Sequence, residues 1–119
     1  MIKLCAIGVI YLLLGIWCTV KARTAAAAVG FELRHDGGLS EFVTVYGGLE
    51  VGMGAAMILT SLDPDLRAGG LVFALVVSAA LPLFRLPTLL ALRVPAGTRV
   101  LFAIELVLAV LLLIAWLRA

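Results

Sequence analysis

The sequence predicts an all-α integral membrane protein, a four-helix bundle with a short interfacial helix after the first span. Hydrophobic residues make up 65% of the 119 residues and charged residues 13%, against roughly 45–50% and 25% in soluble proteins. Four apolar segments alternate with polar connections, and each is close to the roughly 20 residues that a spanning helix needs. Because backbone groups in lipid must be paired within a segment and no alternating pattern indicates a barrel, the spans are expected to be helices.

A single transmembrane domain is expected over residues 1–119, with spans at about 2–20, 42–62, 68–84 and 100–117. In the first span, Gly8 and Gly15 share one face, which would let a neighbouring helix approach closely. Residues 24–29 are apolar and precede Gly30, a residue typical of the position just after a helix. We therefore expect a short helix there, lying at the membrane interface.

The later connections are shorter and contain proline. Pro64 lies in a tight connection, so spans two and three are expected to form an antiparallel hairpin. Pro82 is expected to kink the last turn of the third span. Gly97 or Thr98 is the expected cap of the fourth span.

Glu50 is the most unusual residue of these spans. It lies about eight residues inside the second span, or about 12 Å below the start of the helix at roughly 1.5 Å per residue, near the membrane midplane. An ionisable side chain at that depth costs from about 2.5 kcal/mol upward. Glu50 is therefore the first candidate for a functional residue.

Glu105 and two arginines are expected in the same half of the bilayer as Glu50. Spans two and four run in the same direction, Glu105 follows Arg99 by six residues, and Arg85 ends the third span. If the two carboxylates approach one another, one is expected to hold a proton near neutral pH, because like charges disfavour joint ionisation. A structural alternative pairs Glu105 with Arg85 or Arg99, and Glu50 with Tyr46 or a backbone group.

The second span is expected to present two different faces. At 100° per residue, Gly48 and Gly52 lie opposite Glu50 and, with Gly8 and Gly15, are predicted to serve helix packing, within the bundle or in a dimer. The face around Glu50 resembles a cavity wall. The expected ligand-binding residues are Tyr46, Gly47, Glu50, Met53, Gly54, Arg85, Arg99 and Glu105.

One pattern carries a family resemblance. Glu41-x-x-x-x-Tyr46-Gly47-Gly48-Leu49-x-x-Gly52, on the second of four spans, resembles small bacterial four-helix membrane proteins grouped as a family of unknown function. Those proteins are similar in layout to the DoxX-like proteins. The resemblance covers most of the chain and implies a four-helix bundle in the bacterial inner membrane, without implying an activity.

The residues support three functional hypotheses. In the first, which we prefer, the protein binds or translocates a small or lipid-like molecule in a cavity between spans two and four, with Glu50 as the ionisable residue. In the second, it is a membrane scaffold or accessory subunit that acts through the glycine seams. In the third, Glu50 and Glu105 are the catalytic acid/base pair of a membrane-embedded isomerase or cyclase. An enzyme is the less favoured interpretation.

Composition and motifs exclude other classes. The net charge of +2 is small and dispersed, so no nucleic-acid partner is expected. No nucleotide, haem, iron–sulfur or zinc motif is present, so no cofactor and no metal is expected. The expected partners are the lipid bilayer, a small-molecule or lipid-like ligand and further copies of the chain. The excess of Lys and Arg after spans one and three predicts a multi-pass protein with both termini outside.

Overall fold

The computed structural model describes residues 2–119, which contain helices and no strand. The helices are α1 (Ile2–Val20), α2 (Ala22–Ala28), α3 (Asp36–Phe42), the π-helix η1 (Val43–Leu49), α4 (Glu50–Leu62), α5 (Arg67–Ala91) and α6 (Ala96–Leu117). Because α3, η1 and α4 follow one another without a break, Asp36–Leu62 is one continuous helix. In this described part of the chain, four helices are long and apolar enough to cross a membrane.

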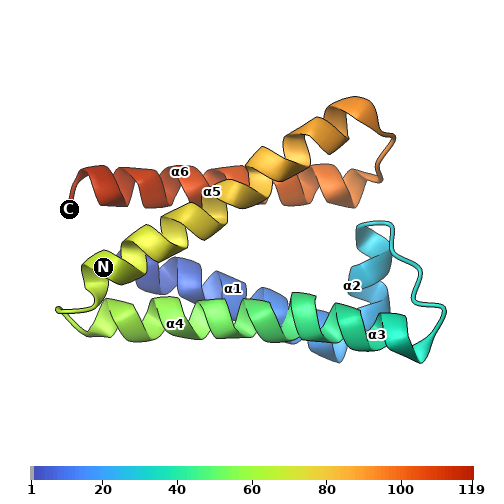
Figure 1. The fold of residues 1–119 in the computed structure, drawn as a ribbon, viewed down its shortest axis with the longest axis horizontal. Helices are drawn as coiled ribbons and strands as arrows, with labels where there is room; N and C mark the ends of the chain where they lie inside the picture. Colours follow the sequence, from blue (N-terminus) through green and yellow to red (C-terminus); the bar gives the residue numbers. More distant parts are fainter. Residues whose placement is uncertain (1) are drawn as a thin grey trace.

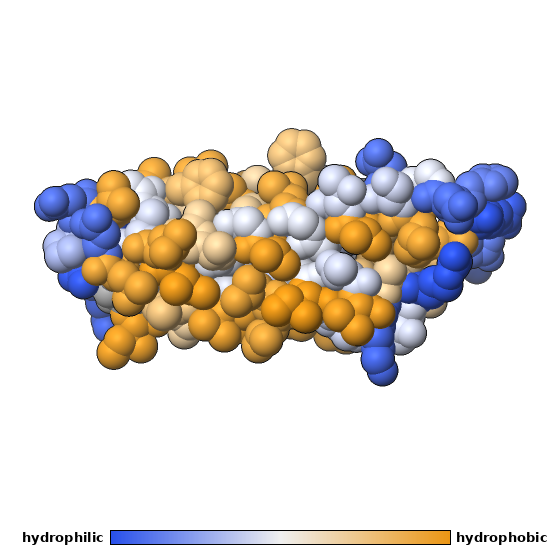
Figure 2. All heavy atoms as spheres, turned by 90° about the horizontal axis from the view of Figure 1, so that it is seen from below, coloured by the Kyte–Doolittle hydropathy of each residue, from blue (hydrophilic) through white to orange (hydrophobic). Residues whose placement is uncertain are grey.

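The long helices form two pairs (Figure 1). α1 lies along α4, and α5 crosses diagonally over α6, while both termini lie at one end of the molecule and α2 and α3 at the other. The molecule measures 45 × 30 × 16 Å, and its longest dimension is close to the roughly 40–45 Å of a bilayer with its headgroups. Figure 2 shows apolar side chains over the middle of one face and hydrophilic residues at its two ends. This distribution is the one expected of a chain that crosses a membrane.

Four glycines allow α1 and α4, with the η1 segment before it, to approach closely. Gly8 lies opposite Gly54, and Gly15 lies opposite Gly47. A Cβ on Gly54 would lie 2.5 Å from the carbonyl oxygen of Gly8, and one on Gly15 would lie 2.7 Å from that of Gly47. Since real side chains do not fit at such distances, glycine is required at these contacts.

The face that carries Gly48 and Gly52 contacts no other helix of the described chain. A Cβ on Gly52 would meet nothing within 4 Å, and one on Gly48 would meet only the Val43 carbonyl oxygen at 4.0 Å. Within the bundle, Gly8 therefore pairs with Gly54 and Gly15 with Gly47. At 100° per residue, Gly47 and Gly54 lie on the same side of the helix as Glu50. For Gly48 and Gly52, the remaining prediction is that they pack against a second copy of the chain.

Three of the long helices extend beyond the predicted spans. The second begins at Asp36, the third runs to Ala91 and the fourth begins at Ala96. α5 continues past its predicted end, and both Pro82 and Pro87 lie inside the helix without ending it. A proline in a helix removes one backbone donor, a loss that neighbouring helices can offset in a membrane protein.

The core joins both helix pairs near the middle of the molecule. Its buried side chains are Leu4, Ile7, Tyr11, Met57, Leu71, Ala74, Leu108 and Leu112. One polar contact crosses it, since the Tyr11 hydroxyl and the Ser78 Oγ are hydrogen-bonded at 2.8 Å. The contact satisfies two buried hydroxyl groups and fixes α1 against α5.

A short helix is present after α1, as predicted for residues 24–29, although α2 begins two residues earlier and ends one residue earlier. α2 ends at Ala28, and Gly30, two residues later, has a left-handed φ of +88°. The backbone N–H of Gly30 donates to the Ala27 carbonyl at 3.1 Å, and that of Phe31 donates to the Ala26 carbonyl at 2.9 Å. These two bonds form a Schellman motif, which turns the chain back toward α3.

The glycine contacts generate a test with a matched control. We expect Gly54→Ala to lower the free energy of unfolding by about 1–3 kcal/mol, because the added Cβ meets the α1 backbone. Gly52→Ala, two residues away and in open space, should raise it by about 0.5–1 kcal/mol through helix propensity. Denaturant titration in mixed micelles measures both, and equal effects would contradict the assigned contact.

Candidate functional site

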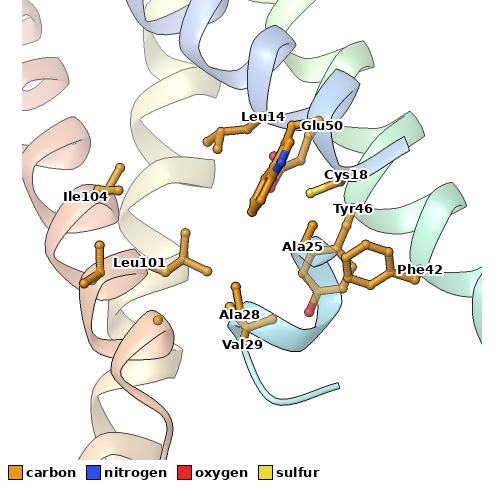
Figure 3. A pocket seen from close by; sticks show the side chains of 13 residues that line it. Leu14, Cys18, Ala25, Ala28, Val29, Phe42, Tyr46, Glu50, Leu101 and Ile104 are labelled. Carbon is orange, nitrogen blue, oxygen red and sulfur yellow. The ribbon is translucent and has the colours of Figure 1, made fainter. Parts of the chain in front are cut away.

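A cavity of about 220 Å³ lies where α1, α2, the η1–α4 region and α6 meet (Figure 3). Its walls are mainly apolar. Leu101 and Ile104 of α6 lie across the cavity from Cys18, Tyr46 and Glu50. The full lining is Leu14, Trp17, Cys18, Ala25, Ala28, Val29, Phe42, Tyr46, Glu50, Gly97, Val100, Leu101 and Ile104.

Glu50 supplies the only charged side chain of the cavity lining. It is half-buried and is the first residue of α4. Among the described residues, none forms a hydrogen bond or an ion pair with its carboxylate, and every fully buried side-chain nitrogen or oxygen in residues 2–119 has a partner. The Glu50 oxygens are therefore open to the cavity rather than enclosed by protein.

The π-helix places Tyr46 and Glu50 on this cavity. Its sequence contains Gly47 and Gly48 in succession, and glycine weakens the preference for a regular α-helix. A π turn contains one more residue than an α turn, so it changes the direction of the side chains around it. Gly47 fits against Thr19, whose Oγ1 donates a hydrogen bond to the Gly15 carbonyl at 2.9 Å. Gly47 therefore packs against α1 at the same place where the π-helix widens the turn.

Phe42 and Tyr46 close one end of the cavity as a stacked pair. Their ring centroids are 4.7 Å apart and their planes differ by 14°. Phe31 contacts both rings edge-on, with centroids 5.9 Å from Phe42 and 5.6 Å from Tyr46. The cluster links the connection after α2 to the start of the second long helix.

Glu105 is paired with Arg85 and does not line the Glu50 cavity. Arg85 Nη2 donates to Glu105 Oε1 at 2.6 Å, and Arg85 Nε lies 3.0 Å from both carboxylate oxygens. The side chain of Glu105 is 7% exposed and that of Arg85 is 23% exposed. The sequence left open whether Glu105 pairs with Arg85, pairs with Arg99 or approaches Glu50, and in the structure it pairs with Arg85. The two carboxylates do not share one pocket.

A second cavity, of about 200 Å³, adjoins the first. Val29, Tyr46 and Leu101 line both cavities, while Arg85 lines the second and not the first. Tyr46 therefore stands between the space next to Glu50 and the space next to the Arg85–Glu105 pair.

The other predicted site residues lie elsewhere. Met53 packs against the central core, and Gly47 and Gly54 lie against α1. Arg99 is exposed and forms no ion pair with the residues that the structure describes. The structure thus brings Tyr46 and Glu50 together on the first cavity, with Arg85 and Glu105 beside it.

Most walls of the cavity come from residues that the sequence analysis did not select. Leu14, Trp17 and Cys18 of α1 follow the i, i+3, i+4 spacing of one helix face. Ala25 and Ala28 of α2 have the same three-residue spacing. This periodicity was available as a signal, but the partner of each face depends on tertiary contacts.

The sequence profile of a family described as a domain of unknown function (DUF4345) matches residues 1–116. The chain belongs to this family. No curated protein and no solved structure matches the chain. The predicted membership of a family of unknown function is confirmed, whereas a DoxX-like layout stays a prediction. All residues that line the cavity lie within the part matched by DUF4345.

The Arg85–Glu105 pair generates a stability prediction. Arg85→Ala leaves a buried carboxylate without its partner, so we expect the free energy of unfolding to fall by roughly 3–5 kcal/mol. Replacing both residues, as Arg85→Met with Glu105→Leu, should recover most of this loss, because no buried charge remains. The exposed Arg99 offers the control, since Arg99→Ala should stay within about 0.5 kcal/mol of the wild type. Equal losses for Arg85→Ala and Arg99→Ala would contradict this assignment.

Proposed function

We propose that this DUF4345 protein is a multi-pass protein of the bacterial inner membrane that binds a small, mainly apolar molecule in the Glu50 cavity. In this arrangement the four long helices form a membrane bundle and α2 lies at the membrane surface. The observation that carries the proposal is the carboxylate of Glu50, which faces an apolar cavity and has no hydrogen-bond or ion-pair partner among residues 2–119. An unpaired ionisable group in such a place is costly, which favours a functional role over a structural one.

The exposed surface supports the membrane part of the proposal. Large apolar side chains are exposed on the outer faces of all the long helices, for example Leu13, Val76 and Val107. Soluble monomers rarely expose contiguous apolar patches of more than a few hundred Å². The hydrophilic residues at the two ends would lie at the headgroups (Figure 2).

The size of the cavity limits the ligand. An apolar cavity of about 150 Å³ is large enough for benzene, and pockets for drug-sized molecules measure roughly 300–1,000 Å³. At about 220 Å³, the Glu50 cavity lies between these sizes. It suits a small ring with a substituent, or one segment of a longer amphiphile.

The cavity has a mouth on the side of the bundle. Trp17, Val100 and Ile104 line it and are nevertheless 41%, 59% and 39% exposed. Trp17 belongs to α1, and the other two belong to α6. An opening between these helices would face lipid, so a membrane-soluble ligand could enter without crossing the headgroups.

Binding is tested by filling the cavity. We expect Leu101→Trp to abolish retention of a co-purified small molecule, because the larger side chain occupies the space between α6 and Glu50. Native mass spectrometry of protein released from mild detergent measures this retention. Leu106→Trp, on the lipid-facing side of the same helix, serves as the control and should retain the molecule. Equal retention by both variants, or an empty wild-type protein, would contradict the proposal.

Orientation follows from the charges once Arg85 is left out. Lys21, Arg23, Arg34, Arg93 and Arg99 lie at the end that carries α2, against Lys3, Arg67 and Arg118 at the end that carries the termini. Because cytoplasmic connections are enriched in Lys and Arg, both termini should lie outside. Alkaline phosphatase fused after Ala119 should therefore be active, and a green fluorescent protein fused there should be dark. The reverse pattern would contradict this orientation.

A further inference from the structure

We infer that the ligand of the Glu50 cavity is a small organic cation, an ammonium group carried on an apolar body. This inference rests on the proposed binding function and names its substrate class. It depends on three observations: the single charge of the cavity lining, the pairing of the arginine of the adjoining cavity with Glu105, and the aromatic rings around the same space.

Within the described residues 2–119, the charge of the cavity has no oppositely charged partner. Glu50 is the only ionisable carboxylate among the lining residues, and no lysine or arginine lines the cavity with it. Arg85, in the adjoining cavity, directs its Nε and Nη2 to Glu105 at 2.6–3.0 Å. A cationic ligand would supply the partner that Glu50 lacks, since a charge in apolar surroundings is stabilised by an opposite charge.

Three aromatic side chains, Trp17, Phe42 and Tyr46, line the cavity together with Glu50. Aromatic faces attract ammonium groups through the ring quadrupole, and aromatic rings around one space are a known arrangement for quaternary ammonium ligands. Aromatic side chains also line pockets for neutral ligands. It is the combination of these rings with the Glu50 carboxylate that favours a cation over a neutral molecule.

Other charged ligands fit less well. An anion would be repelled by the Glu50 carboxylate. The Arg85 guanidinium in the adjoining cavity is already paired with Glu105. A metal ion would need several ligands, and no group of three or more His, Cys, Asp or Glu side chains able to hold one occurs among residues 2–119. A single carboxylate with aromatic neighbours is suited to an organic monocation.

The experiment compares two probes of equal shape and different charge, benzyltrimethylammonium and neopentylbenzene. The full chain carries Trp116→Phe, so that Trp17, at the cavity, becomes the only tryptophan whose fluorescence reports binding. We expect saturable binding of the cation in detergent micelles and at least tenfold weaker binding of the neutral probe. Glu50→Gln should weaken the cation at least tenfold, whereas Glu41→Gln, an exposed carboxylate on the same long helix, should leave it unchanged.

A second variant tests the aromatic contribution while keeping Glu50. Tyr46→Leu should weaken binding of the cation severalfold and weaken binding of the neutral probe by a smaller factor, because only the cation loses the attraction to the ring face. Equal binding of both probes, unaltered by Glu50→Gln, would overturn the cation inference but leave the proposed binding function standing. If neither probe binds, the cation inference is also overturned. Retention of a co-purified molecule by the wild type but not by Leu101→Trp would then show that the cavity binds another class of ligand.

Discussion

The close approach of α1 to α4 and η1 is the constraint on which the rest of the structure depends. Gly47 and Gly54 are committed to the backbone of α1, so the residue between them in the helical turn, Glu50, lies at the edge of this contact. Its side chain lines the cavity beside the helix pair. Packing and cavity thus occupy neighbouring parts of one helix face, and the position of the carboxylate follows from the backbone contact.

Glu50 and Glu105, the two carboxylates within the apolar parts of the long helices, have different surroundings. Glu105 is buried and its charge is matched by Arg85 through a two-pronged contact. Glu50 is left without such a partner but is open to a cavity. The apolar contacts of the bundle must offset the cost of this unmatched carboxylate. This difference separates a structural residue from a candidate functional one.

The sequence predicted the helices and singled out Glu50, because apolar length and an isolated charge are local properties. It could not show which glycines contact α1, since this choice depends on the tertiary partner and on the π-helix, which alters a phase computed at 100° per residue. The extent of α5 was also hidden, because Pro82 usually ends a helix outside a membrane. The walls supplied by Leu14 and Ala25 became visible only when α1 and α2 were placed beside α6.

α2 touches both halves of the molecule although it is only seven residues long. It follows α1 directly, and its last residue, Ala28, places its carbonyl oxygen so close to Gly97 at the start of α6 that a side chain there would collide with it. Ala28 and Gly97 both line the cavity. The short helix therefore connects the α1–α4 pair with the α5–α6 pair. A change in the separation of the two helix pairs would alter the volume of the cavity beside Glu50. Under the proposed binding function, a ligand in the cavity would therefore oppose any change in the spacing of the helix pairs.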